Sequence, residues 1–179
     1  MNESVQSGRV RQLREEFDGS FRRAREPVKT SDVDALLLRV GTDDARHLLP
    51  VSSLTLLQQM PKTRPLPGAG DNLLGLALLR GRVVPVFCLA RLLATTPIAT
   101  PGWVVGIGAE LDYALAFAEL IELRCFSPAA VRDGGIQSNA HLRQVLLEAG
   151  HSTPLISIPS ISAALGQTGT ALSGSTSHV

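Results

Sequence analysis

Short apolar segments interrupted by turns make up most of this chain, and no other feature of the sequence restricts its fold as much. About ten such segments lie between residues 35 and 165, and Gly, Pro and small polar residues separate them. Short strands at regular spacing are typical of barrels and sandwiches. The sequence therefore predicts an all-β fold with only short helices.

The density of charge divides the chain into three parts. The first 35 residues hold 14 of the 33 charged side chains, and the remaining 144 hold 19. In the leader, residues 1–34, apolar side chains recur every three or four positions, which predicts an amphipathic helix that ends before Pro27 and packs on the body or docks on a partner. The body, residues 35–165, is expected to form one domain. Residues 166–179 are rich in Gly, Ser and Thr, and we expect a disordered tail.

Two long apolar runs form the most informative segment of the body. Leu73–Leu79 and Val83–Leu89 meet at Arg80-Gly81-Arg82. Gly81 can adopt the positive φ of a tight turn, so the segment predicts a β-hairpin with charged side chains at its tip.

Other apolar runs predict further elements. Hairpins are expected around residues 41–44, 108–112 and 150–152, and Leu120–Leu123 is expected to extend the strand that ends at Phe117. The domain is expected to close with a short helix over Ser160–Leu165, with Ser160 as its N-cap.

No pattern in the sequence predicts catalysis, a metal or a cofactor. The four histidines are far apart, and Gly-x-Ser-x-Gly and the phosphate-binding glycine patterns are absent. Glu119 and Glu122 lie in a segment expected to be extended, which would point them to opposite faces. Cys88 and Cys125 are interpreted as buried thiols without a metal or redox role.

Composition also restricts the partners and the location. A net charge of +1 and seven aromatic residues in all argue against binding of nucleic acid. The N-terminus has no apolar signal segment, and no apolar run approaches the roughly 20 residues that cross a bilayer. We therefore expect a soluble, cytoplasmic protein.

At the hairpin segment the chain resembles the signature of the CheW-like family, a family of chemotaxis adaptors. The resemblance extends over about Leu36–Leu165, and the residues that match the signature at the right offsets are Gly75, Arg80, Gly81, Pro85, Val86 and Leu89. It implies two intertwined five-stranded β-barrels with a groove between them and no catalytic activity or cofactor. The implied partners are the cytoplasmic tip of a chemoreceptor, the regulatory domain of a CheA-type histidine kinase and other CheW-like proteins.

Three positions depart from the family pattern. Leu78 stands where the family usually has Asn, Cys88 where it has Asp, and Leu56 where an acidic residue often pairs with the signature arginine. Arg80 is therefore expected either to lack an internal partner or to pair with another acid. These departures indicate a divergent or specialised member.

The resemblance also implies residues that bind partners. By position, Arg80 would lie near the receptor-facing groove, where a guanidinium can form forked hydrogen bonds, or it is a solvated turn charge. Leu54 would contact receptor helices, and Val104 is a further candidate, although both could be ordinary core residues. Alternative functions are a scaffold of a type IV pilus or other specialised chemosensory pathway, and a sensor that binds a small apolar ligand between the barrels.

Overall fold

The computed structural model describes residues 32–134, 139–148 and 150–171, with side chains described as far as Gly166. Apart from Asp32, these residues belong to one unit, Val33–Val179. The amphipathic helix expected in the leader falls outside the described residues. The domain limits at 35 and 165 stay predictions.

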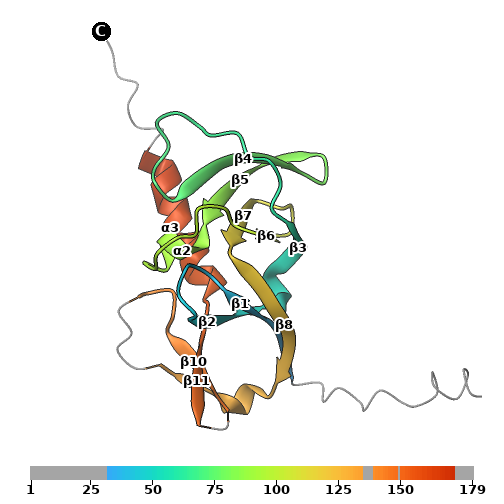
Figure 1. Ribbon diagram of the computed structural model, residues 1–179, viewed down its shortest axis with the longest axis vertical. Coiled ribbons are helices and arrows are strands. Elements are labelled where there is room, and N and C mark those ends of the chain that lie inside the picture. Colours follow the sequence, from blue (N-terminus) through green and yellow to red (C-terminus); the bar gives the residue numbers. More distant parts are fainter. Residues whose placement is uncertain (1–31, 135–138, 149, 172–179) are drawn as a thin grey trace, which may run out of the picture. The chain divides into compact units, whose positions relative to one another are not determined.

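The described residues form eleven strands in two mostly antiparallel sheets. Figure 1 shows their arrangement. The six-stranded sheet has the order β8-β1-β2-β11-β10-β9, and the five-stranded sheet has the order β3-β6-β7-β5-β4. The strands of the first sheet are β1 (Val33–Arg39), β2 (Arg46–Pro50), β8 (Glu119–Phe126), β9 (Val131–Asp133), β10 (Gln144–Glu148) and β11 (His151–Leu155). Those of the second are β3 (Leu54–Gln59), β4 (Leu73–Leu79), β5 (Arg82–Cys88), β6 (Trp103–Ile107) and β7 (Tyr113–Phe117).

The chain enters the six-stranded sheet, crosses to the five-stranded sheet and then returns. The 3-10 turn η1 (Val51–Ser53) makes the first crossing, and Ala118 between β7 and β8 makes the second. We expected Leu120–Leu123 to extend β7, and this is wrong. The segment belongs to β8, which pairs with β1 in the other sheet. The strands β7 and β8, which are neighbours in the sequence, thus belong to two different sheets.

Apolar packing between and within the sheets explains the unbroken apolar runs. In β1, Leu36 and Leu38 belong to a central cluster with Leu115 and Phe117 of the other sheet. The alternate residue Leu37 belongs to a second cluster inside the six-stranded sheet. Because both faces of β1 are buried, its sequence shows no polar alternation. A third cluster fills the five-stranded sheet.

The fold is mostly β, as expected, but the expectation of two intertwined five-stranded β-barrels is wrong in the number of strands and because the barrels are not closed. Among the described residues the strands divide six and five, and in each sheet the hydrogen-bonded order has two ends. The six-stranded sheet nevertheless curls: Arg124 on β8 lies 3.3 Å from Glu148 on β10, although three strands lie between them in the order. Among the described residues this exposed ion pair, and no backbone ladder, joins the two strands.

Glycine at position 75 allows an irregular feature of the outer strand β4. The residue has φ +139° at a register shift between β4 and β5, and the loop residue Arg64 lies directly against it. Arg64 and Leu76 exchange two backbone hydrogen bonds of 2.8 Å. A side chain at position 75 would overlap the Arg64 carbonyl group, so only glycine permits this close approach.

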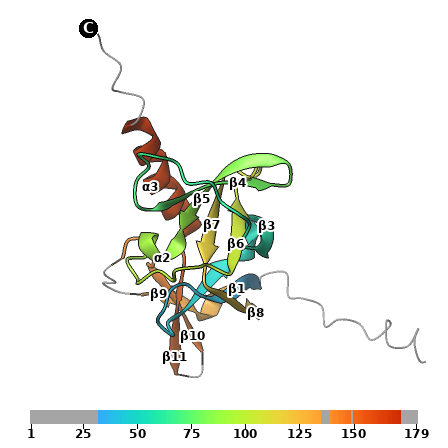
Figure 2. The same ribbon diagram turned by 45° about the horizontal axis from the view of Figure 1, so that its top comes forward.

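In the part of the chain that the structure describes, two α-helices accompany the sheets. The helix α2 (Leu89–Leu92) follows β5, and α3 (Ile158–Ala171) closes the fold beside the five-stranded sheet (Figures 1 and 2). The helix α3 begins at Ile158, before Ser160, so the prediction that Ser160 is its N-cap is wrong. The Tyr113 hydroxyl forms a 2.7 Å hydrogen bond with that of Ser162, which ties α3 to β7. Among the described residues no helix is long and apolar enough to cross a membrane.

Candidate functional site

Arg80 lies at the tip of the β4–β5 hairpin, where the sequence predicts it. Arg80 and Gly81 both have positive φ, +47° and +79°, so they form the two central residues of a tight turn whose twist matches that of the strands. The Arg80 side chain is exposed, and within the described part of the chain it has no ion pair. The next cation, Arg82, is held by Glu110 at 2.7 Å.

In the family pattern an acidic residue often pairs with the signature arginine, which is Arg80 here. A core residue, Leu56, takes the place of that acid. Leu56 is 9% exposed and packs among Leu79, Val86 and other apolar side chains. No carboxylate is available at this position, so Arg80 has no internal partner there. Of the two alternatives derived from the sequence, the structure favours the exposed arginine.

Leu54 opens β3, an edge strand of the five-stranded sheet. It pairs with Ile107 on β6, and a register shift follows at Thr55. The Leu54 side chain is partly buried and packs against the central cluster. It therefore combines a fixed position with an accessible apolar surface, which is what a contact residue requires.

Val104 occupies the interior of the same sheet. Its side chain is completely buried in the cluster of the five-stranded sheet, opposite Gln58 in the register of β3 and β6. A partner cannot reach it without rearrangement of the sheet. This position favours a packing role, and partner contact by Val104 stays a prediction.

The strand order separates the three candidates into two places. Leu54 and Val104 lie on the neighbouring strands β3 and β6, whereas Arg80 lies at the end of β4, the opposite edge of the sheet. The surface around Arg80 contains a feature that the sequence did not predict. Leu78 and Val83 stand opposite each other and are 66% and 70% exposed. The signal in the sequence that could have predicted this exposed pair is Leu78, which stands where the family usually has Asn.

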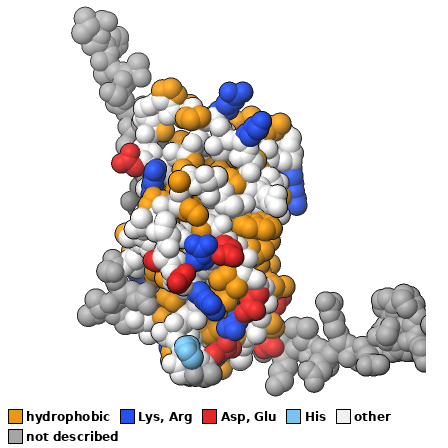
Figure 3. Space-filling view, viewed as in Figure 1, with side chains coloured by type: hydrophobic (Ala, Val, Ile, Leu, Met, Phe, Trp, Pro, Cys, Tyr) orange, Lys and Arg blue, Asp and Glu red, His pale blue; other side chains and the backbone are white. Residues whose placement is uncertain are grey.

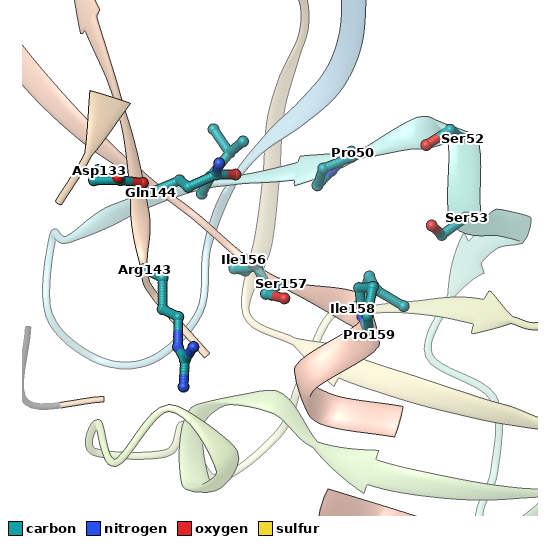
Figure 4. Close-up of a pocket in the computed structure, with 11 residues that line it drawn as sticks. Pro50, Ser52, Ser53, Asp133, Arg143, Gln144, Ile156, Ser157, Ile158 and Pro159 are labelled. Carbon is teal, nitrogen blue, oxygen red and sulfur yellow. The ribbon is translucent and has the colours of Figure 1, made fainter. Parts of the chain in front are cut away.

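A cavity of about 520 Å³ lies between the six-stranded sheet and the start of α3. Figure 4 shows Ser52 and Ser53 on one side of it and Asp133, Arg143 and Gln144 on the other. Its volume is within the range of small-ligand sites. The lining residues come from η1, β2, β9, β10, β11 and α3, so no local motif in the sequence could have marked them.

A serine–histidine contact beside the start of α3 lacks the other parts of a catalytic centre. His141 Nδ1 lies 2.8 Å from the hydroxyl of Ser160, which also donates to the carbonyl of Ala140. Burial lowers the pKa of His141. No carboxylate of the described residues contacts His141 to orient it as a base, as a hydrolytic triad requires. The described residues also contain no group of three or more His, Cys, Asp or Glu that could hold a metal ion.

The cysteines differ from each other. Cys88 is buried in the central cluster, as predicted, whereas Cys125 on the edge strand β8 is exposed, so the prediction of a buried thiol is wrong there. Cys125 pairs with the exposed Asp34 of β1, whereas the next residue, Phe126, is buried, so Cys125 lies on the outer face of β8.

Comparisons with known proteins agree on the fold. The family model of the CheW-like domain matches residues 34–165. Among solved structures, the scaffolding protein TtCheW from Thermoanaerobacter tengcongensis is similar, with a TM-score of 0.61 and 9% sequence identity. The match covers 69% of this chain and 88% of that one. The comparison with curated proteins gives no match.

Proposed function

The chain belongs to the CheW-like family, and we propose that it is a non-enzymatic adaptor that couples chemoreceptors to a CheA-type histidine kinase. One observation carries the proposal: the family match, residues 34–165, covers the whole body of the chain. TtCheW, a solved structure with a similar fold, is a scaffolding protein. We propose a cytoplasmic location, next to the cytoplasmic tips of the receptors.

An adaptor acts through the surfaces that it presents to its partners. Leu54 offers an apolar contact at the edge strand β3, suited to the apolar face of a receptor helix. Arg80 offers an exposed guanidinium, on a backbone fixed by a tight turn, that is suited to a carboxylate or to backbone carbonyls. Because each contact is small, several tethered contacts in an array would supply the avidity.

The experiment is a binding titration of the full chain with a purified cytoplasmic fragment of a receptor and, separately, with the regulatory domain of the kinase. We expect Leu54→Ser and Arg80→Glu each to weaken receptor binding by about tenfold, which corresponds to about 1.4 kcal/mol. The matched control is Arg46→Glu, which makes the same charge change at an exposed position of the six-stranded sheet. Unchanged affinity for Arg80→Glu would remove this residue from the site.

The same titration separates the two forms of the adaptor proposal. Binding to receptors and kinase of a type IV pilus or other specialised pathway, without binding to those of a flagellar pathway, would favour the specialised scaffold. Of the three departures only Leu78 is exposed, so its replacement should then alter the choice of partner, whereas Leu56 and Cys88 are buried.

The cavity in Figure 4 supports a second candidate, a sensor of a small ligand. Its serine, aspartate, arginine and glutamine side chains suit a ligand with polar groups better than the apolar metabolite that the sequence suggested. Thermal unfolding in the presence of a metabolite extract tests this candidate. A rise in melting temperature that Arg143→Ala abolishes would favour the sensor, and no rise would leave the adaptor as the better account.

A further inference from the structure

The inner face of the six-stranded sheet changes from apolar to polar near one end of its strands. Four residues of the apolar cluster inside this sheet lie on β8, β2, β10 and β11: Phe126, Leu48, Leu146 and Leu155. Alternate residues of a strand share a face, so the next inward positions toward that end are Arg124, Arg46, Glu148 and Thr153, respectively. The apolar interior therefore ends in a layer of charged and hydroxyl side chains.

These four side chains line a cavity of about 510 Å³, together with Leu37 and residues 151 and 152. Leu37 is the one buried residue of the lining, so the cavity has an apolar floor and polar walls. Figure 3 shows acidic and basic side chains gathered over this sheet, in the lower half of the view. The volume lies within the roughly 300–1,000 Å³ of small-ligand sites. The cavity of Figure 4 shares no lining residue with it and lies at the other end of β2, β10 and β11.

The charges around this cavity are not fully paired with one another. Arg124 forms ion pairs with Glu122 at 2.7 Å and with Glu148 at 3.3 Å, so one guanidinium serves two carboxylates. Arg46 is exposed and forms no ion pair with any residue that the structure describes. The lining thus holds one cation without an anionic partner, Arg46, and one carboxylate in excess, Glu148, which is the more distant partner of Arg124.

A ligand that carries both charges matches this arrangement better than a simple anion or cation. An anion would be attracted by Arg46 but repelled by Glu148, and a cation would meet the reverse. Arg46 presents a planar fork of N–H donors that suits a carboxylate, and the hydroxyl of Thr153, on the neighbouring strand β11, can donate to the same group. The Glu148 carboxylate can accept the hydrogen bonds of an ammonium group.

We propose that this cavity binds a small zwitterion of the amino-acid type. The carboxylate of the ligand lies against Arg46, its ammonium group against Glu148 and its side chain over Leu37. The site contains none of the residues proposed to bind receptors, and it is separate from the cavity of Figure 4. The proposal therefore goes beyond the adaptor role and can fail independently of it.

The first measurement is thermal unfolding of the full chain in the presence of each standard L-amino acid at millimolar concentration. A ligand that binds only the folded state raises the melting temperature, so at least one amino acid should do so. Isothermal titration calorimetry with the amino acid that gives the largest rise should show one site per chain. Arg46→Gln and Glu148→Gln should each weaken binding at least about tenfold, because each removes a charged partner of the ligand. Both positions are exposed, so folding should persist, and far-UV circular dichroism checks it.

Two derivatives of the same amino acid show whether both charges are recognised. The N-acetyl derivative lacks the ammonium group and the amide lacks the carboxylate, and each should bind at least about tenfold more weakly than the parent. The matched control is Arg143→Gln, the same substitution in the cavity of Figure 4, and it should leave the affinity unchanged. An N-acetyl derivative that binds as tightly as the parent would overturn the proposal, because the site would then take any small anion. So would the absence of a rise with every amino acid, or binding that Arg143→Gln abolishes and Arg46→Gln does not.

Discussion

The substitution Gly75→Ala tests whether the close contact between the loop and β4 organises the hairpin. An added Cβ would lie 2.7 Å from the carbonyl carbon of Arg64 and closer still to its oxygen, at a backbone φ of +139°. Backbone strain of this kind costs about 1–3 kcal/mol. If the loop moves away, the two hydrogen bonds between Arg64 and Leu76 are lost, at about 0.5–1.5 kcal/mol each. The substitution should therefore destabilise the fold by about 2–6 kcal/mol.

Urea unfolding followed by tryptophan fluorescence measures this loss. At an m-value of about 2 kcal/mol/M, the midpoint should fall by about 1–3 M. The matched control is Gly81→Ala, because Gly81 also has positive φ, +79°, but no atom lies within 4 Å of the position of an added Cβ. That substitution should cost only the left-handed backbone strain, about 1–2 kcal/mol. Equal losses in the two variants would refute the role of the close contact.

Three further substitutions test the core and the charge states. Burial lowers the pKa of His47 from its ordinary 6.5, against smaller opposing effects of the Ala45 backbone and Asp43, so the neutral form is favoured in the fold. Because the fold opposes protonation, its stability is full above about pH 6.5 and falls as the pH drops from 6.5 toward the lowered pKa. His47→Gln should therefore flatten the pH dependence of the unfolding free energy, and an unchanged slope would contradict this. Leu115→Ala empties a fully buried position and should cost about 2–5 kcal/mol in thermal or urea unfolding. Leu56→Glu should destabilise the fold far more than Leu57→Glu on the exposed side of the same strand, and equal urea midpoints would show that the site accepts a carboxylate.

Local sequence patterns predicted the elements of the fold better than their connections. The hairpin at Arg80 and Gly81 follows from turn chemistry and two apolar runs, and β4 and β5 match them closely. The strand β8 was assigned to the wrong sheet, because Leu120–Leu123 is as apolar as a continuation of β7 would be. Pairing of β8 with β1 depends on contacts between residues about 80 positions apart, which no local pattern reports.

The sequence predicted where the candidate site residues lie along the strands and turns, but not whether the fold buries or exposes them. The sequence placed Arg80 at an exposed tip, and the structure confirms that place. It could not distinguish Leu54 from Val104, since both are aliphatic residues of strands; only the packed sheet shows that one is accessible and the other buried. The exposed pair Leu78 and Val83 was missed for the same reason, because apolar residues in a hairpin are usually expected to face a core.

A three-component sedimentation experiment tests the proposed adaptor role most directly. The full chain is mixed with a receptor cytoplasmic fragment and the regulatory domain of the kinase, each also tested with the chain alone. We predict one complex that contains all three proteins, with the receptor fragment and the kinase domain joined only when the chain is present. A chain that binds one partner solely by displacing the other, or that binds neither, would contradict the account.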